Sequence, residues 1–591
     1  MPVRRYRPAI AIRLNWLRRR VFSRGNEIGL ILLGIAAGGM AGLVVCAVSG
    51  LSSLMHTLLY GVGFAEGLSG ADLARGWSLV VVPVSGGLLT VVLVHLRRRR
   101  GSIIDPIEAN ALYGGRMSLT DSIWVTLQNL ASNGFGLSAG LEAAYTQLSS
   151  GIASKLGVKL KLRREDMRVL VGCGSAGAIA AAFGAPLTGA FYAFELIIGT
   201  YTSRSLIPVV SAAIAAWLCA RAMSGQIFVI DVGKLGGISA LDVVPAVMLG
   251  VICAVLGILV MIGVVRTERL AARSGLPVWL RPAAGGLLVG LLALITPQVL
   301  SAGHGALHLN LEHDVALPAL ILLFVLKAVA SALTIGSGFR GGLFFASLLL
   351  GGLVGKALAV PLDWLVPGML SAPALAVIGM SAFGVAVIGG PLAMTFLALE
   401  VTGEFPIAVL VLAAAMTSSL VVRQSFGYSF STWRFHLRGE TIRSAHDVGW
   451  IRNLTVGRLM RRDLRTAPAA ISPDEFRRSF PLGSTQRVIV TDQDGAYVAM
   501  VSVPEIHADA SAAEPSQQLS AFFRHQGDIL LPGMNARQAA SLFETSQTEA
   551  LAVVSDRIER RVIGLLSEAH TLRRYSEELD KQRRTMIGLV E

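Results

Sequence analysis

A single acidic side chain, Glu142, lies in a stretch of small and apolar residues. The segment 134–147 reads Gly-Phe-Gly-Leu-Ser-Ala-Gly-Leu-Glu-Ala-Ala-Tyr-Thr-Gln, and no basic residue occurs from Ala131 to Ser154. A carboxylate at membrane depth must be protonated, hydrated or held by donors, because its isolated charge is costly there. Flanking glycines let backbone N–H groups approach closely, and a helix N-terminus attracts an anion. The pattern predicts an anion site with a titratable gate. The alternative is a carboxylate that only caps the helix.

Composition places this segment in a membrane protein. The chain has 591 residues, of which 53% are hydrophobic, 15% are charged and 64 are glycine. Apolar runs that are long enough, or nearly so, to span a bilayer cover residues 28–48, 79–94, 243–264 and 317–333. Other apolar runs are interrupted by Gly or Pro, as in proteins whose broken helices end at a site inside the bilayer. We therefore predict an all-α polytopic membrane domain.

The net charge of +14 does not indicate nucleic-acid binding, because arginines cluster beside the apolar runs, as they do at the ends of membrane-spanning segments. Eight arginines precede Glu27, and Arg97–Arg100 follow the second long apolar run. Basic flanks of this kind mark the cytoplasmic side, so we expect both termini in the cytoplasm and the protein in the inner or plasma membrane. The four cysteines lie in apolar runs without metal spacing and are interpreted as packing thiols.

An internal repeat divides the membrane part. The segment Ala-Pro-Leu-Thr-Gly-Ala-Phe-Tyr-Ala-Phe-Glu ending at Glu195 recurs as Gly-Pro-Leu-Ala-Met-Thr-Phe-Leu-Ala-Leu-Glu ending at Glu400. In each copy the Glu follows the Pro by nine residues, and a Gly-Leu element begins 46 or 49 residues before that Pro, at Gly140 and Gly342. Chance similarity among Gly- and Ala-rich helices is the alternative to duplication. We predict an inverted repeat of broken helices, with halves at 27–235 and 236–440, after a basic segment 1–26.

Beyond residue 440 the composition becomes that of a soluble domain, 441–591, which again holds two copies of one pattern. Short apolar strands begin at Arg487 and Tyr497 in the first copy and at Ala550 and Val562 in the second, with an Asp-containing turn between each pair. A helix-like segment precedes each pair, at 473–480 and 536–545. The pattern predicts a tandem α/β module.

Together these segments resemble the CLC family of chloride channels and transporters, with a C-terminal tandem CBS pair. The resemblance covers residues 27–575. The matching segments are Ala-Ala-Phe-Gly-Ala-Pro-Leu-Thr-Gly from Ala181, Leu-Glu-Val-Thr-Gly from Leu399, Gly-Gly-Leu-Phe-Phe-Ala from Gly341, and Leu-Ser-Ala-Gly-Leu-Glu-Ala-Ala from Leu137.

The resemblance implies a homodimer with one pathway per subunit for chloride or another small anion. It puts Glu142 in the position of the gating glutamate, which closes the path when ionised and opens it when protonated or swung aside. The anion-binding positions that it implies are Gly140, Leu141, Ala143, Leu343, Phe344, Ile103 and Ser431. Backbone amides at such positions offer partial positive charge without trapping the anion.

Several positions depart from the family pattern. Ile103 stands where the family has a serine hydroxyl, and acidic Asp105 lies nearby. Ser431 aligns with the pore tyrosine, although Tyr428 fits a shifted alignment. The family's arginine before the gating glutamate is replaced by Leu141. Arg340 replaces a proline and either offsets Asp105 or the lost arginine, or makes a structural or surface ion pair.

These departures weaken the case for ordinary chloride selectivity, and bicarbonate, nitrate and fluoride remain open. The proton-coupled members carry an inner glutamate at the position of Leu196, which cannot hold a proton. A voltage- or pH-gated channel that conducts anions passively is therefore favoured over a proton-coupled antiporter. Glu195 and Glu400 are expected to pair or to cap within their own helices.

No cofactor is required by this reading, although the CBS-like pair could hold an adenine nucleotide. The matching positions are Ser502 and Glu505 in one copy and Ser567 and His570 in the other, and neither keeps the family's ribose-binding Asp. A structural dimerisation module without ligand is slightly favoured. Metal binding by His304, His308 and His313, in a predicted loop, is a minor alternative. The sequence shows no nucleophile–base set of a membrane enzyme, so the chain is not expected to be an enzyme. A non-conducting sensor is a minority hypothesis.

Overall fold

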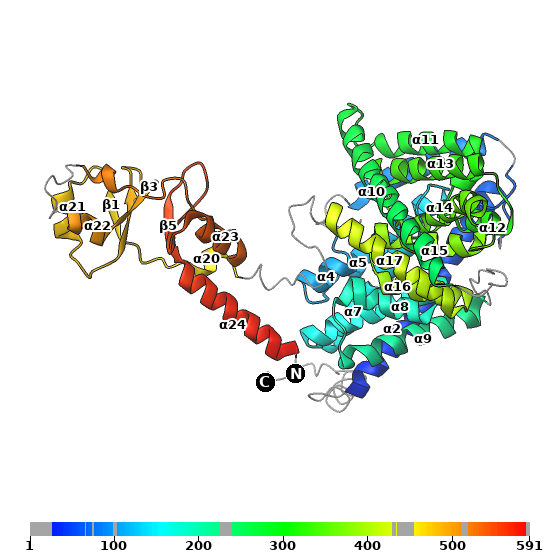
Figure 1. Ribbon diagram of the computed structural model, residues 1–591, viewed down its shortest axis with the longest axis horizontal. Coiled ribbons are helices and arrows are strands. Elements are labelled where there is room, and N and C mark those ends of the chain that lie inside the picture. Colours follow the sequence, from blue (N-terminus) through cyan, green and yellow to red (C-terminus); the bar gives the residue numbers. More distant parts are fainter. Residues whose placement is uncertain are drawn as a thin grey trace, which may run out of the picture. The chain divides into compact units, whose positions relative to one another are not determined.

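A computed structural model describes residues 27–64, 67–73, 76–97, 103–224, 239–427, 429, 433, 454–509 and 518–586. The chain forms two compact units, Met1–Asp447 and Val448–Glu591, which are considered separately (Figure 1). The predicted basic segment 1–26 and the predicted boundaries at 235 and 440 lie outside the described residues.

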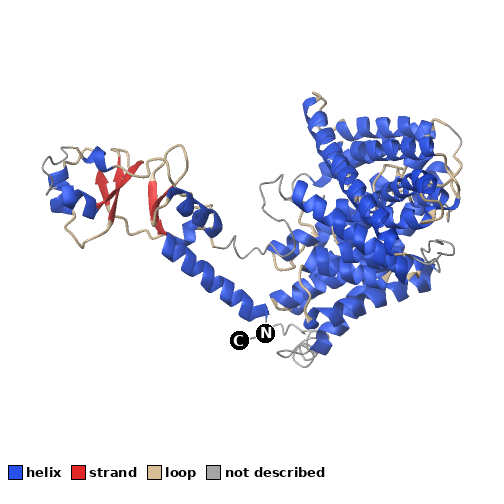
Figure 2. Cartoon of the chain, viewed as in Figure 1, coloured by secondary structure: helices blue, strands red, loops and turns tan. Residues whose placement is uncertain are grey.

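The first unit is helical throughout its described part, as Figure 2 shows. Eight of the described helices are long and apolar enough to cross a membrane: α2, α3, α7, α9, α10, α13, α14 and α17. The elements are α2 (Glu27–Tyr60), α3 (Ser78–Arg97), α4 (Pro106–Leu112), α5 (Leu119–Gly134), α6 (Glu142–Leu160), α7 (Arg164–Phe183), α8 (Pro186–Tyr192), the π-helix η1 (Ala193–Ile198), α9 (Ser203–Ser224), η2 (Ala240–Asp242), α10 (Val243–Arg273), α11 (Arg281–Ile295), η3 (Pro297–Val299), α12 (His304–Glu312), α13 (Leu317–Gly336), α14 (Phe344–Leu365), α15 (Ala372–Ile388), α16 (Pro391–Thr402) and α17 (Phe405–Ser425).

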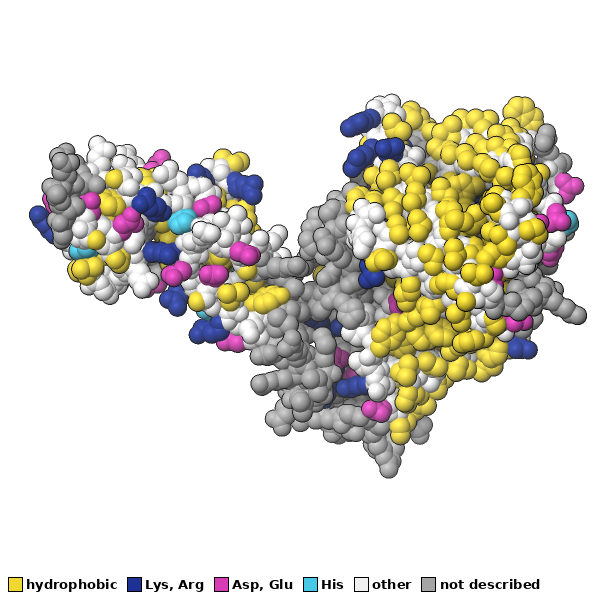
Figure 3. Space-filling model, in the orientation of Figure 1, with side chains coloured by type: hydrophobic (Ala, Val, Ile, Leu, Met, Phe, Trp, Pro, Cys, Tyr) yellow, Lys and Arg dark blue, Asp and Glu magenta, His cyan; other side chains and the backbone are white. Residues whose placement is uncertain are grey.

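The distribution of side chains in this unit suits a lipid environment. Large apolar residues cover the face shown in Figure 3. Leu58, Leu218 and Leu259 are each more than half exposed, whereas Gln128, Asn129 and Lys327 are buried. An apolar exterior around buried polar groups is the arrangement expected for helices packed within a bilayer.

The two halves meet at equivalent residues. Gly140 and Gly342 form an isolated antiparallel bridge, in which each backbone N–H donates to the other's carbonyl over 2.9 and 3.1 Å. The rings of Phe191 and Phe396 stack with centroids 4.2 Å apart. Both pairs occupy matching places in the repeat, which supports duplication over chance similarity.

The prediction that Glu195 and Glu400 cap within their own helices is wrong, because each caps the helix of the other half. The Glu195 carboxylate accepts from the N–H groups of Leu392 and Ala393, over 3.1 and 2.9 Å, at the start of α16. The Glu400 carboxylate accepts from the N–H groups of Leu187 and Thr188, over 2.7 and 2.8 Å, at the start of α8. A helix start leaves several N–H groups without intrahelical partners, and these crossed carboxylates satisfy two of them in each helix.

The second unit contains two similar α/β repeats. The predicted strand pairs are confirmed as antiparallel hairpins, and parallel β1 extends the first of them. The elements are α20 (Val456–Leu459), β1 (Thr466–Pro468), α21 (Pro473–Ser479), β2 (Arg487–Thr491), β3 (Tyr497–Ser502), α22 (Val503–Asp509), η4 (Leu519–Phe522), α23 (Ala536–Ser546), β4 (Ala550–Val554), β5 (Val562–Ser567) and α24 (Glu568–Met586). The helices predicted at 473–480 and 536–545 correspond to α21 and α23.

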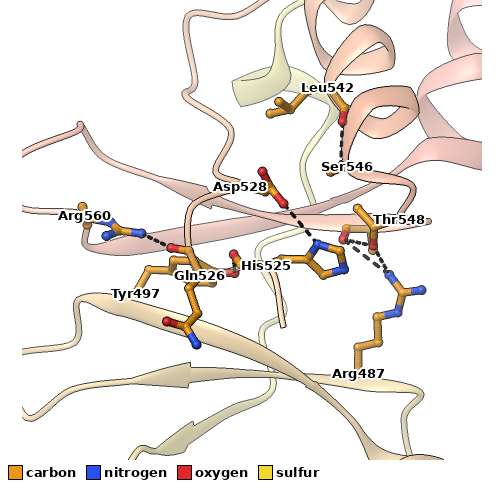
Figure 4. A network of polar contacts seen from close by, with 10 residues as sticks. Arg487, Tyr497, His525, Gln526, Asp528, Leu542, Ser546, Thr548 and Arg560 are labelled. Atoms are coloured by element: carbon orange, nitrogen blue, oxygen red, sulfur yellow. Dashed lines mark hydrogen bonds and ion pairs between the residues drawn. The ribbon is translucent and has the colours of Figure 1, made fainter. Parts of the chain in front are cut away.

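A polar seam joins the two repeats (Figure 4). The Arg487 guanidinium of β2 donates to the Thr548 hydroxyl over 2.7 Å. The Tyr497 hydroxyl donates to the His525 carbonyl over 2.6 Å, while the Arg560 guanidinium lies over the Tyr497 ring, 5.6 Å from its centroid. Apolar residues of both hairpins, including Ile489 and Val554, pack in one cluster beside this seam. The repeats therefore share a core and form one module.

Candidate anion site

The carboxylate of Glu142 lies where the two halves touch. Glu142 is the first residue of α6 and is 5% exposed. Its carboxylate accepts hydrogen bonds from its own backbone N–H and from the N–H of Phe345 in α14. The oxygen Oε2 has no hydrogen-bond partner among the described residues. The side chain is thus folded back onto a backbone donor of the opposite half, with one oxygen left unsatisfied.

Two glycines make room for this carboxylate. A Cβ on Gly140 would collide with Oε2, and a Cβ on Gly342 would lie 3.2 Å from the same oxygen. The bridge between these glycines brings the starts of α6 and α14 together. No side chain caps either helix, since the N-cap residues are Leu141 and Leu343. The Glu142 carboxylate itself occupies the first-turn N–H groups of Glu142 and Phe345, so an anion at these helix starts would have to compete with it for those donors.

The structure therefore brings five of the predicted anion-binding residues together at the two helix starts. They are Gly140, Leu141, Ala143, Leu343 and Phe344. Oriented backbone dipoles, and not cationic side chains, dominate this part of the site. Such donors hold an anion weakly enough for it to leave again.

A polar face of α13 supports the Gly140 segment from behind. The Ser138 hydroxyl lies 2.9 Å from the hydroxyl of Ser331, and its backbone N–H donates to the Thr334 hydroxyl over 3.2 Å. One turn earlier, the fully buried Lys327 ammonium donates to the carbonyls of Val299 and Ser301 over 3.0 and 2.8 Å. Sequence reasoning missed Lys327. A lone lysine inside the apolar run 317–333 is the signal that could have found it.

Two of the three histidines, His304 and His308, lie on a helix and not in the predicted loop. His304 begins α12, and His313 follows its last residue. The His304 ring is exposed and stacks on the buried Phe345 ring, with centroids 3.5 Å apart. The described residues contain no group of three His, Cys, Asp or Glu side chains that could hold a metal ion. The imidazole instead covers the residue whose N–H holds Glu142.

Asp105 has a local role that the sequence predicted. It is the N-cap of α4, and its carboxylate accepts from the Glu108 N–H over 2.8 Å, with Pro106 at the first helical position. The adjacent Ile104 carbonyl accepts from the Gln147 side chain over 3.0 Å, which ties this turn to α6. Ile103 is half-buried beside it and offers no side-chain donor. The cap gives Asp105 a structural role in this turn, and its electrostatic role stays a prediction.

The structure describes only some of the remaining residues that were predicted to line the anion path. Arg340 is half-buried, directly before the Gly341–Gly342 turn. Ser431 and its alternative Tyr428 lie outside the described residues. Leu196, at the position of the inner proton site, packs against Gly389 and Gly390 at the start of α16. Tyr192, which sequence reasoning missed, places its ring 6.1 Å from the ring of Phe344.

The two predicted nucleotide positions of the second unit are equivalent in place but different in chemistry. Ser502 ends β3 and Ser567 ends β5. The Glu505 carboxylate pairs with Arg524 over 2.7 Å. Partial burial, with the nearby Arg573, Arg461 and Arg574, lowers the pKa of His570 below its usual range. Glu505 is therefore already engaged, whereas His570 has a cationic setting.

Comparison with known proteins decides the family. The family model described as voltage gated chloride channel matches residues 86–423, more than half of the chain. This protein belongs to the CLC family.

Bacterial chloride channel proteins are among its relatives. It is 30% identical over 349 residues to a ClcB-like chloride channel protein of Ralstonia nicotianae, covering 58% of this chain and 81% of that protein. It is 27% identical over 404 residues to the voltage-gated ClC-type chloride channel ClcB of Shigella flexneri, covering 66% of this chain and 95% of the relative. The CLC family comprises channels and transporters of chloride and other small anions, so this chain is an integral membrane protein of that class.

Solved structures share the fold. A slow cyanobacterial Cl-/H+ antiporter aligns with a TM-score of 0.61 and 21% identity, over 69% of this chain and 97% of its own. A CLC-type fluoride/proton antiporter aligns with a TM-score of 0.57 and 20% identity, over 68% and 97%. A eukaryotic CLC transporter aligns with a TM-score of 0.56 and 19% identity over 94% of this chain, a span that includes residues of the second unit. The predicted CLC architecture is confirmed.

Proposed function

We propose that this protein is an anion channel of the CLC type, gated by Glu142 and conducting chloride or another small anion passively. The observation that carries the proposal is the position of the Glu142 carboxylate, on the Phe345 N–H and between Gly140 and Gly342. An anion bound there would need the same donors, so carboxylate and anion compete. Protonation weakens the carboxylate's hold on these donors, and membrane voltage acts on its charge, so either can open the path.

Passive conduction is favoured because the inner proton site is absent. Leu196 occupies that position, and its side chain lies beside Gly389 and Gly390. The alternative is proton-coupled exchange by another route, and it has support from the fold, since two of the similar structures are described as chloride/proton and fluoride/proton antiporters. The protein would work as a homodimer in the inner or plasma membrane, with both termini in the cytoplasm.

The test is anion efflux from proteoliposomes loaded in turn with chloride, nitrate, bicarbonate and fluoride, with internal pH recorded together. Wild type is compared with Glu142→Gln and with the control Glu404→Gln, which alters an exposed carboxylate that makes no cap hydrogen bond. Efflux under a valinomycin clamp without uphill proton movement is expected. Glu142→Gln should conduct at every pH, while Glu404→Gln should follow wild type.

Two outcomes contradict this proposal. Uphill proton movement coupled to anion efflux, and lost in Glu142→Gln, makes the protein an antiporter. If the vesicles release none of the four anions, the protein does not conduct them, and the result favours the hypothesis of a non-conducting sensor.

We propose that the second unit is mainly a structural module. The ion pair between Glu505 and Arg524 supports this role, because it engages the carboxylate that would otherwise face a ribose. Adenine nucleotide binding at Ser502 and Ser567 is the alternative. Titration of the full chain with ATP, followed by calorimetry, is expected to give no heat of binding, and saturable binding would establish nucleotide regulation.

A further inference from the structure

Tyr192 lies at a break in regular helix, near residues of α4 and α14. It is the last residue of α8, and the chain continues as the π-helix η1. A π-helical turn is rare and is frequently found at functional sites, because it turns side chains out of the regular helical register. The Tyr192 ring is partly buried and packs beside Ile107 of α4 and Leu196 of η1. Its ring also lies 6.1 Å from that of Phe344. It thus contacts elements from both halves of the protein.

The hydroxyl of Tyr192 has no assigned hydrogen bond within the described part of the chain. Enclosed tyrosine hydroxyls usually find a partner, because an unmatched donor loses its hydration without compensation. The negative charges close enough to act on this hydroxyl are the carboxylates of Asp105 and Glu142. Asp105 is already held by the Glu108 N–H. The Tyr192 O–H is consequently a donor left over between the gate and the α4 turn.

An anion that leaves its water needs donors at this level of the path. The Ile103 side chain offers none, and the Glu108 N–H in the first turn of α4 is already held by the Asp105 carboxylate. We propose that the Tyr192 hydroxyl donates a hydrogen bond to the permeating anion on the α4 side of Glu142. A neutral hydroxyl stabilises a dehydrated anion without the deep trap that a cation would create. This inference rests on the proposed anion conduction and adds to it a residue that discriminates between anions.

The substitution Tyr192→Phe tests this role because it removes one oxygen and keeps the ring on Phe344. Tyr201→Phe is a matched control, since Tyr201 lies beyond the same π-helix, is 52% exposed and packs on Phe194 with ring centroids 5.3 Å apart. Chloride binding is measured by calorimetry on the purified full chain, and efflux of chloride and thiocyanate in proteoliposomes. A hydrogen bond to a charged group predicts about tenfold weaker chloride binding in Tyr192→Phe. Preference should shift toward weakly hydrated thiocyanate, and Tyr201→Phe should match wild type.

The outcomes separate this inference from the proposed function. Equal chloride binding and equal anion preference in wild type and Tyr192→Phe would overturn the role of the hydroxyl while leaving conduction intact. Equal losses in both tyrosine variants would also overturn it, because the effect would then not be specific to the path. A wild type that binds chloride without conducting it would refute the channel, and the binding constants of the two variants would still decide the role of Tyr192.

Discussion

The two halves of the membrane unit are alike at one level and different at another. At α8 and α16 the repeat is nearly symmetric, with stacked Phe191 and Phe396 and with each glutamate capping the opposite helix. At α6 and α14 the matching elements are Gly-Leu-Glu from Gly140 and Gly-Leu-Phe from Gly342. One half supplies the carboxylate and the other supplies the N–H that holds it. The symmetric contacts hold the two halves together, and the single Glu-to-Phe difference supplies the carboxylate that we propose as the gate.

Substitution of Lys327 should have the largest effect on stability, because this buried cation has no counterpart among the described residues of the first half. Lys327→Met would leave the carbonyls of residues 299–301 unpaired, and we expect a loss of about 3 kcal/mol in stability. Thermal unfolding of the detergent-solubilised protein measures this. Lys356→Met is the control with a smaller expected loss, since Lys356 donates to two carbonyls near the exposed end of α12. Equal losses for the two lysines would contradict the ranking.

The crossed caps predict paired losses of similar size in the two halves. Glu195→Ala removes the acceptor of two N–H groups, and Glu400→Ala removes the acceptor of two N–H groups and the Thr188 hydroxyl. We expect each to lower stability by about 1–2 kcal/mol, with Glu400→Ala the larger. Thermal unfolding checks the order. A loss in only one variant would show that the symmetry of contacts is not a symmetry of energy.

Gly140→Ala and Gly342→Ala compare the two halves at the proposed gate, through their effects on chloride efflux. A Cβ added at Gly140 meets the Glu142 carboxylate as its nearest obstacle, so the glutamate side chain must leave its donor. We expect Gly140→Ala to raise chloride efflux at neutral pH about tenfold, as a shift toward the open population. A methyl group added at Gly342 needs a displacement of only tenths of an ångström, so Gly342→Ala should change efflux less. Wild-type efflux in Gly140→Ala would mean that the carboxylate does not block the path.

The two repeats of the second unit also differ at equivalent positions, where one has Glu505 and the other has His570. The pKa of His570 is lowered by partial burial and by the nearby arginines. The folded unit therefore binds this proton less readily than the unfolded chain, and its stability should fall by less than about 1 kcal/mol as pH drops below about 6.5. Hydrogen exchange at residues 562–577 of the full chain, compared at pH 7.5 and pH 5.5, measures the effect. His570→Gln should remove the part due to this histidine, and an unchanged pH dependence would assign it elsewhere.

Local features of the fold could be predicted from the sequence, and long-range partners could not. The Asp105 cap and the strand pairs depend on neighbours in the chain, and both were predicted with correct positions. The duplication indicated that Glu195 and Glu400 were equivalent. Their bonds nevertheless span 197 and 213 residues, and no local pattern specifies the helix that each one caps.

The site was predictable to the same degree. Glu142 and its glycines are visible in the sequence as a charge among small residues. Tyr192 and Lys327 are less evident, because their importance depends on which elements pack around them. His304 was wrongly predicted to lie in a loop, because it falls between two apolar runs where the family has a glycine-rich external turn. The structure instead uses Gly303, at a φ of 104°, to start α12.

The crossed caps also impose an order on synthesis. The N–H groups that begin α8 are satisfied by a side chain that leaves the ribosome 213 residues later. Until then, this short helix has an incomplete end in or near lipid, where water cannot replace the missing acceptor. The cap of α8 therefore forms only after the second half has been synthesised. Membrane insertion and completion of the fold are therefore separate steps for this chain. A chain truncated before Glu400 would insert its first half without the carboxylate that caps α8.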